Sequence, residues 1–215
     1  MHQPGMMRRA GKLCSAGWRI GGPAGWRASA CCRDIAFILM MLLAGPALAF
    51  DTAPRVLPAQ GTVQAAFAPW DDVESILVEA LDTARRTIRV QAYLLTSKKI
   101  AGALVAAKQR GIDVQVLADA EQSHVASAKL DMLAAAGIPV FLETRYQNAH
   151  NKIVLIDPLS TAPTVITGSF NFTWTAQHKN AENILILRNN PDIATRYAVN
   201  WDRHLQQATP YEPLR

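Results

Sequence analysis

Cysteine is scarce in this sequence, and the few cysteines present are confined to its beginning. The chain of 215 residues has three of them, Cys14, Cys31 and Cys32, and none follows position 32. The part after position 49 can therefore form no disulfide, bind no zinc through thiolates and use no cysteine nucleophile.

An excess of charge of either sign is missing from most of the chain. The formal net charge is +5, but residues 1–49 hold six basic residues and one acid, Asp34, whereas 16 basic and 16 acidic residues balance from Phe50 onward. The net charge thus says nothing about partners of the later part. The six early basic residues are Arg8, Arg9, Lys12, Arg19, Arg27 and Arg33.

Repeats, low-complexity segments and familiar cofactor motifs are also absent from the sequence. There is no phosphate-binding glycine loop and no H-E-x-x-H, and the one close pair of carboxylates, Asp71 and Asp72, stands where a helix should begin. We therefore expect one domain that needs neither a metal nor a cofactor.

The long apolar run lies near the start and is typical of an export signal. IAFILMMLLAGPALA, residues 35–49, follows the basic segment and ends in Ala-Leu-Ala. Such an ending suits signal peptidase, and 15 residues with a Gly-Pro break fall short of the ~20 that span a bilayer. We predict a signal peptide over residues 1–49 with cleavage after Ala49, a linker over 50–61 and a folded domain over 62–215.

This prediction implies a bacterial periplasmic or secreted protein with no stable membrane association once processed. Retention of the apolar segment as an anchor is the alternative. Translation could also begin at Met6 or Met7, because the stretch before the apolar run is unusually long.

Hydrophobic periodicity indicates an α/β fold. Strand-like and helical segments alternate as far as Gly137, after which strand-like segments follow one another up to a last helix that begins at Pro191. This order predicts a mixed β-sheet flanked by helices on both faces. The expected strands are residues 62–68, 87–95, 113–119, 138–144, 152–157, 164–172 and 182–187, and the expected helices are residues 73–84, 97–111, 129–137 and 191–205.

Two apolar strands carry polar pairs at an unusual spacing. In HNKIVLIDPLSTAPTVITGSFNFT, residues 150–173, His150 and Lys152 open the first strand, and Ser169 and Asn171 lie inside the second. Residues two apart point to the same side of a strand, and burying a charge is costly unless it is paired or used. The pairs therefore predict a functional site built on strands.

These residues also form a recognisable motif. His150, Lys152 and Asp157 read H-x-K-x4-D, followed by GSFNFT and then by KNAEN at 179–183. The pattern resembles the phospholipase D superfamily, and more closely its small secreted bacterial endonucleases of the Nuc type, which carry one such motif per chain. The resemblance implies a phospholipase D-like fold, with Asp157 and Gly168 as structural members of the motif.

The chemistry of the residues agrees with the resemblance. A neutral imidazole can attack an anionic phosphodiester without charge repulsion, which suits His150 as a nucleophile. Lys152 can neutralise a non-bridging oxygen, while the Asn171 amide and the Ser169 hydroxyl can donate hydrogen bonds to the phosphoryl group. Glu182 is the candidate to hold the second ring nitrogen of His150, and the family has an acid at the matching place.

Basic residues outside the motif are candidates for contact with substrate. Lys98 and Lys99 stand at a predicted helix start, and Lys179 lies in a polar loop. We list them as substrate-binding candidates. His204 is expected to pack beside Trp201.

The expected function is a metal-independent phosphodiesterase that cuts DNA, and RNA as a further substrate, as a nonspecific endonuclease. It would act through a phosphohistidine and leave 5′-phosphate ends. The rivals are a phospholipase D-type lipid phosphodiesterase and an inactive nucleic-acid-binding module. Since only His150 is followed by lysine two residues on, a second catalytic histidine must come from another copy, which predicts a homodimer with a shared active site.

Overall fold

The computed structural model describes residues 54–125 and 128–213. The expected signal peptide and its cleavage site lie outside the described residues, and so do the first residues of the expected linker. The described residues from Arg55 onward form one compact unit.

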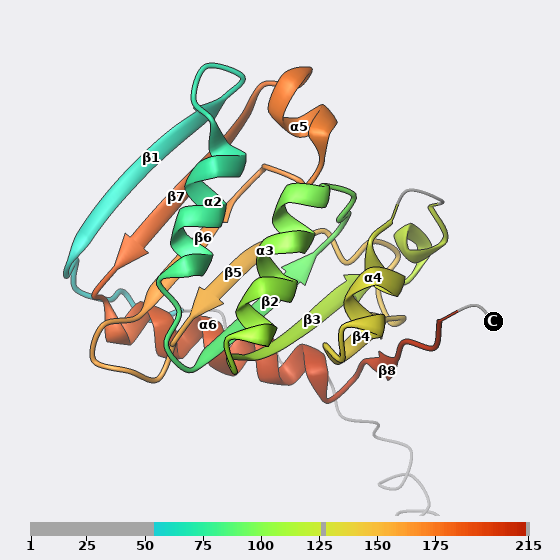
Figure 1. Cartoon of the computed structure of the whole chain (residues 1–215). Helices are drawn as coiled ribbons and strands as arrows, with labels where there is room; N and C mark the ends of the chain where they lie inside the picture. Colours follow the sequence, from blue (N-terminus) through green and yellow to red (C-terminus); the bar gives the residue numbers. More distant parts are fainter. Residues whose placement is uncertain (1–53, 126–127, 214–215) are drawn as a thin grey trace, which may run out of the picture. The chain divides into compact units, whose positions relative to one another are not determined.

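An eight-stranded sheet forms the centre of this unit, with the strand order β1-β7-β6-β5-β2-β3-β4-β8 (Figure 1). Strand β2 pairs in parallel with β3, and β3 with β4, while all other neighbours are antiparallel. The sheet is therefore mixed, as predicted. Its strands are β1 (Thr62–Ala68), β2 (Thr87–Ala92), β3 (Asp113–Asp119), β4 (Val140–Glu143), β5 (Lys152–Ile156), β6 (Thr164–Gly168), β7 (Glu182–Arg188) and β8 (Thr209–Pro210).

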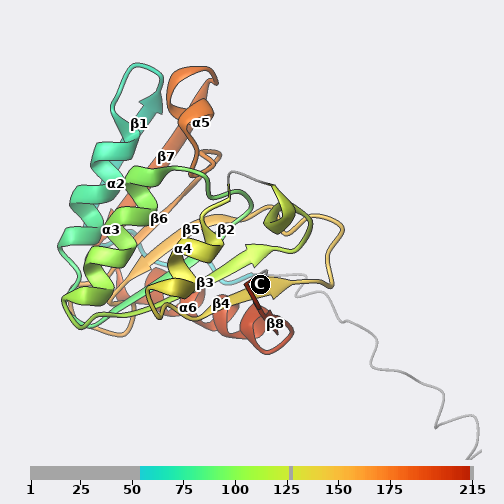
Figure 2. The same ribbon diagram turned by 45° about the vertical axis from the view of Figure 1, so that its right-hand side comes forward.

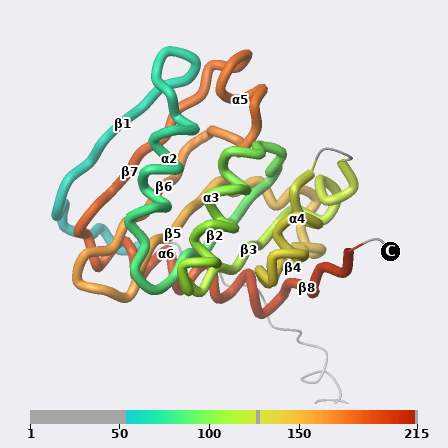
Figure 3. The backbone as a smooth tube through the Cα atoms, viewed as in Figure 1, coloured from blue at the N-terminus to red at the C-terminus, as the bar shows by residue number. Residues whose placement is uncertain are grey.

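Helices cover both faces of the sheet, which confirms the predicted fold class. Helices α2 (Val73–Asp82), α3 (Lys98–Gln109) and α4 (Leu130–Ala135) lie on one face, and the long α6 (Pro191–Leu205) crosses the other (Figures 1 and 2). The short α5 (Trp174–His178) sits at one end of the sheet beside the turn after β1, as the tube in Figure 3 also shows. A 3-10 turn, η1 (Glu121–His124), follows β3.

Alternation along the strands separates two apolar layers. In β5, Val154 and Ile156 belong to the core under α2, α3 and α4, whereas Ile153 and Leu155 face α6 with Trp201. The Trp201 indole donates to Val90 O at 3.4 Å and so joins α6 to β2. A strand buried on both faces reads as a continuous apolar run, as KIVLI does.

Polar residues begin the helices where the sequence predicts their starts. Asp72, Ser97 and Asn190 each accept a hydrogen bond from a backbone amide of the first turn of α2, α3 and α6. Gly111 follows α3 with φ of +87°, the left-handed conformation that glycine adopts easily at a helix end.

The predicted placement of motif residues on two strands is wrong. Strand β6 ends at Gly168, so Ser169 and Asn171 follow the strand rather than lie inside it. Strand β5 begins at Lys152, so His150 precedes it. Among residues 54–125 and 128–213, no helix combines the length and apolarity that crossing a bilayer requires.

Candidate active site

The candidate residues gather at one end of the sheet. His150 and Lys152 lie where β5 begins, Ser169 and Asn171 follow the end of β6, and Glu182 begins β7. Because β5, β6 and β7 are antiparallel neighbours, the start of β5, the end of β6 and the start of β7 meet at the same edge. The fold therefore brings together the five residues that the sequence singled out.

Lys152 is held against the backbone of His150. Its side chain is only 6% exposed, and its Nζ donates to His150 O at 2.7 Å and stands 4.8 Å from the centre of the Tyr93 ring. Burial lowers the pKa of Lys152 to about 8, while the nearby carboxylates of Glu182 and Asp119 oppose this change. A lysine of this kind is charged at neutral pH and is ready to pair with an anion.

The ring of His150 faces outward beside the same tyrosine. His150 is exposed, and its ring centre lies 4.3 Å from that of Tyr93 at an interplanar angle of 57°. Tyr93 is brought there by backbone pairing, because its amide donates to Asn151 O at 2.9 Å. The arrangement leaves an accessible imidazole next to a buried cation.

The segment after β6 keeps its alternation although it is no longer a strand. Phe170 and Phe172 are buried in the core, which turns Ser169 and Asn171 the other way. The Phe172 carbonyl accepts from Thr96 N and Ser97 N at 3.0 and 2.9 Å, so the segment is anchored to the chain that follows β2. The spacing argument for the polar pair holds, with the two phenylalanines as its physical cause.

The Asn171 side chain has an unused acceptor. Its Oδ1 is buried and has no hydrogen-bond partner among the described residues. An unsatisfied buried acceptor is unfavourable unless a donor such as water meets it, whereas the Nδ2 group of the same side chain can donate to a phosphoryl oxygen of a substrate.

Glu182 lies in the site, where its carboxylate contacts other polar side chains of the chain, and its contact with His150 stays a prediction. Its Oε2 accepts from Ser169 Oγ at 2.5 Å and its Oε1 from Asn180 Nδ2 at 2.9 Å. Its charge also acts on Lys152, whose pKa it raises. The carboxylate is thus oriented by two polar side chains beside the cation.

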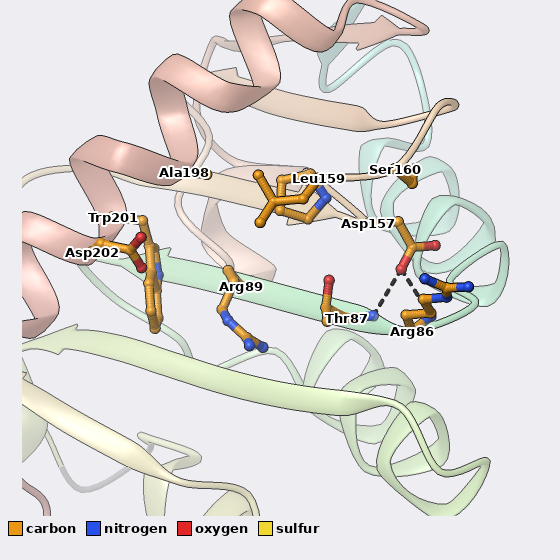
Figure 4. Close-up of a pocket in the computed structure, with 10 residues that line it drawn as sticks. Arg86, Thr87, Arg89, Asp157, Leu159, Ser160, Ala198, Trp201 and Asp202 are labelled. Carbon is orange, nitrogen blue, oxygen red and sulfur yellow. Dashed lines mark hydrogen bonds between the residues drawn. The ribbon is translucent and has the colours of Figure 1, made fainter.

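Asp157 lies at the opposite end of β5 from His150. Its buried carboxylate accepts backbone hydrogen bonds at 2.8 Å each from Arg85, Arg86 and Thr87, and Figure 4 draws those from Arg86 and Thr87. These bonds join the turn after β5 to the start of β2. The structural role expected of Asp157 has this geometry as its basis.

Gly168 occupies a close approach between two strands. A Cβ atom placed on Gly168 would lie 2.2 Å from Asn183 O and 2.8 Å from Ile184 Cα. No larger residue fits without moving β7, and β7 carries Glu182.

The three candidate lysines lie at the same end of the sheet but differ in their contacts. Lys98 is exposed at the first position of α3. Lys99 donates to Ser75 Oγ at 2.6 Å and pairs with Asp72, so it joins α3 to α2 rather than facing the candidate site. Lys179 follows α5, with its Nζ 5.8 Å from the centre of the Trp174 ring.

Sequence reasoning missed three residues that shape the site: Tyr93, Asp119 and Asn180. Asp119 could have been found, since it ends a parallel strand and ligand sites of such sheets lie at the carboxyl ends of strands. Tyr93 could not, because only the pairing of β2 with β5 brings it beside His150. His204, expected only to pack, also contacts the buried carboxylate of Glu143.

The cleft drawn in Figure 4 belongs to the other end of the sheet. It has a volume of about 320 Å³ and lies between the start of β2, the turn after β5 and α6, with Arg86, Arg89 and Trp201 on its walls. Of the motif residues only Asp157 lines it. We therefore place the chemistry at the His150 edge and not in this cleft.

Comparison with known proteins agrees with this geometry. Residues 77–205 match the family described as cardiolipin synthase, PLD-like domain. The chain belongs to the phospholipase D superfamily. A phospholipase D of Rickettsia bellii (strain RML369-C) is 34% identical over 143 residues, which cover 66% of this chain and 69% of that protein.

Solved structures place this phospholipase D-like chain beside small members of the superfamily. The crystal structure of a phospholipase D family member, Nuc from Salmonella typhimurium, superimposes on this chain with a TM-score of 0.66. The two sequences are 33% identical, and the aligned region covers 71% of this chain and 99% of the Nuc chain. The NucT protein of Helicobacter pylori shares the fold, with a TM-score of 0.62 at 21% identity over 70% of this chain and all of that chain. The chain is a phospholipase D-like phosphodiesterase.

Proposed function

We propose that this phosphodiesterase is an endonuclease that hydrolyses DNA, with RNA as a further substrate. The observation that carries the proposal is that the exposed imidazole of His150 and the buried ammonium of Lys152, which donates to the His150 carbonyl, both lie against Tyr93. The single H-x-K-x4-D motif, which resembles the Nuc-type endonucleases, and the likeness to Nuc over 99% of that chain support a nuclease.

In the proposed reaction, a ring nitrogen of His150 attacks the phosphorus, and the bond from phosphorus to the 3′-oxygen breaks. A second histidine gives its proton to the leaving oxygen, and the other strand end stays on His150 as a phosphohistidine. Water, deprotonated by the second histidine, then breaks the P–N bond and releases a 5′-phosphate. Lys152 neutralises the phosphoryl oxygens throughout, and the Asn171 amide donates a hydrogen bond to them.

The second histidine is proposed to be His150 of another copy. H-x-K occurs once in the sequence, and among the residues that the structure describes the ring neighbour of His150 is Tyr93 rather than another histidine. A twofold homodimer would bring two His150 side chains to one phosphate.

Substrate, location and metal independence are parts of the same proposal. The apolar run at residues 35–49 supports export to the periplasm or beyond the cell. Among the described residues, no group of three or more histidine, cysteine, aspartate or glutamate side chains could hold a metal ion. Metal independence stays a prediction that a chelator tests.

Plasmid cleavage in EDTA is the test. Purified protein should nick and then linearise supercoiled plasmid, and ligase should accept the 5′-phosphate ends. His150→Ala should reduce the rate at least about 1,000-fold, because the nucleophile is lost. His124→Ala, which removes another exposed histidine, should keep the wild-type rate. Loss of cleavage in EDTA with recovery in magnesium would contradict the mechanism.

A lipid phosphodiesterase is the second candidate, and the names of relatives favour it. Besides the Rickettsia phospholipase D, the mitochondrial cardiolipin hydrolase of Mus musculus is 30% identical over 113 residues, which cover 53% of this chain and 49% of that protein. Hydrolysis of cardiolipin or phosphatidylcholine vesicles, with plasmid left intact under the same conditions, would establish the lipid function instead. An inactive binding module would bind DNA and cut neither substrate.

A further inference from the structure

Asp119 is a buried carboxylate next to the candidate site that no motif includes. It ends β3, and its side chain is 1% exposed. Among residues 54–125 and 128–213 it takes part in no salt bridge. A buried charge with no ion-pair partner is costly, so its presence calls for an explanation.

Its two oxygens hold two loops. Asp119 Oδ2 accepts from Ala149 N at 2.7 Å, and Oδ1 accepts from Gln122 N in the turn after β3 at 3.0 Å. Ala149 is itself buried and directly precedes His150. The first bond therefore ties the backbone that carries the nucleophile to the end of a central strand.

Two further hydrogen bonds hold the backbone at His150 and Asn151. The His150 carbonyl accepts from Lys152 Nζ at 2.7 Å, and the Asn151 carbonyl accepts from Tyr93 N at 2.9 Å. In each of the three successive residues 149 to 151, a backbone atom is thus held by a hydrogen bond. Asp119 supplies the only one of the three bonds whose acceptor is a side chain.

Asp119 also acts on the cation of the site. The groups that face Lys152 are Tyr93 after β2, Asp119 at the end of β3, Glu182 at the start of β7 and the His150 carbonyl. Burial lowers the pKa of Lys152 to about 8, and the charges of Glu182 and Asp119 raise it against that effect. Removing the Asp119 charge would let the pKa of Lys152 fall further.

We propose that Asp119 is a positioning residue of this phosphodiesterase, which fixes the backbone at His150 and places a negative charge near the ammonium of Lys152. The inference rests on the proposed roles of His150 and Lys152. It does not depend on whether the natural diester belongs to a nucleic acid or to a lipid.

The test is the pH profile of Asp119→Asn on bis(p-nitrophenyl) phosphate, a small diester that needs no binding surface. The amide keeps the size of the carboxylate but loses its charge and one acceptor oxygen. We expect kcat to fall about 10- to 100-fold, since misplaced catalytic groups cost that much. The alkaline limb of the profile should move to lower pH by about half a unit or more, because Lys152 then loses its proton earlier.

Asp113→Asn is the matched control. Asp113 begins the same strand and is exposed, so the same substitution there should leave the alkaline limb in place. Asp119→Glu keeps the charge but displaces the oxygen that holds Ala149, so it should lower kcat and leave the limb near its wild-type pH. A folded Asp119→Asn protein with wild-type kcat and an unmoved limb would overturn the proposal.

Two measurements on the wild-type protein decide the matter if the variants fail to fold or if no diester is cleaved. The Ala149 amide should exchange with deuterium slowly compared with other amides of residues 144–151. The side chain of Lys152 should titrate near pH 8 by NMR of its ε-carbon, far below an ordinary lysine. Rapid exchange at Ala149 would refute the anchoring whatever the substrate is, and failure of plasmid cleavage alone would refute only the endonuclease.

Discussion

Lys152 is both buried and charged, and burial disfavours the charged form of a lysine. It is buried enough to hold the carbonyl of His150, and it must also carry a charge toward the phosphate. The protein satisfies both by placing Glu182 and Asp119 close enough to support the charge without forming a salt bridge with Lys152. The ammonium of Lys152 thus remains available to pair with an anionic substrate.

The pH dependence of turnover should reveal this lysine. Because the pKa of Lys152 is about 8, the charged form dominates at pH 7 and is lost as the pH rises through 8. We expect kcat/KM on bis(p-nitrophenyl) phosphate to decline about tenfold per pH unit above that point. Lys152→Arg should be slower at pH 7 and show no such decline, since arginine stays charged. A wild-type profile that is level to pH 10 would contradict the assignment.

Asp157 is expected to matter for stability and not for chemistry. Asp157→Asn leaves Oδ1 able to accept from Arg86 N and Thr87 N but turns an amide donor toward Arg85 N. We expect a loss of about 1–3 kcal/mol in the free energy of unfolding, or a melting temperature lower by several degrees. Urea unfolding measures the loss, and the specific activity of the folded fraction should stay unchanged. A variant that is stable but inactive would move Asp157 into the catalytic machinery.

The sequence predicts individual site residues where polar or charged side chains interrupt an apolar segment. His150 and Lys152 stood out because a strongly apolar segment rarely carries such groups without a use. The direction of Ser169 and Asn171 was also predictable, since Phe170 and Phe172 must face inward. The contact between Glu182 and Ser169 was not predictable, because several polar side chains lie within reach of that carboxylate.

At the scale of elements, β6 and β7 determine how closely the site is packed. Strand β6 leaves β7 after Gly168, and the chain then bridges to Leu95 through Phe172. The apolar alternation continues across this change of partner, which is why the sequence predicts one strand up to residue 172. Periodicity shows which side a residue faces and does not show which neighbour it pairs with.

Gly168→Ala should separate these two strands. The added methyl group would meet the backbone of Asn183 and Ile184, so we expect about 1–3 kcal/mol of destabilisation or more, together with reduced turnover. Gly102→Ala is the matched control. Gly102 lies inside α3, and a Cβ atom added there would have no neighbouring atom within 4 Å. Alanine at this position should therefore stabilise the protein by up to about 1 kcal/mol. Equal effects at both positions would show that close strand packing is not the cause.

At the scale of the whole molecule, the two halves of the chain contribute different parts of the site. The parallel strands β2 and β3 provide Tyr93 and Asp119 near their ends, whereas the antiparallel strands β5 to β7 carry the motif residues. The alternation of elements predicted the mixed sheet with helices on both faces. The strand order could not be predicted in the same way, because β2 pairs with β5 across 60 positions of the chain, and no local pattern records that partnership.

A shared site predicts a distinctive outcome when subunits are mixed. If wild-type and His150→Ala chains are unfolded together and refolded in equal amounts, a dimer that needs both histidines keeps about one quarter of the activity. Independent sites would keep about half. Refolding with His124→Ala in place of His150→Ala should keep full activity, and sedimentation should find dimers throughout. Retention of half the activity would exclude the shared histidine.

The pairing of β2 with β5 also affects when the active site forms during folding. Closing a loop of some 60 residues is slow compared with forming a helix or a hairpin. Until that closure, Tyr93 is away from His150, Ala149 lacks its acceptor and Lys152 remains in water as an ordinary flexible cation. The newly synthesised chain therefore cannot hydrolyse a phosphodiester before β2 and β5 pair. Its activity arises only when folding is complete.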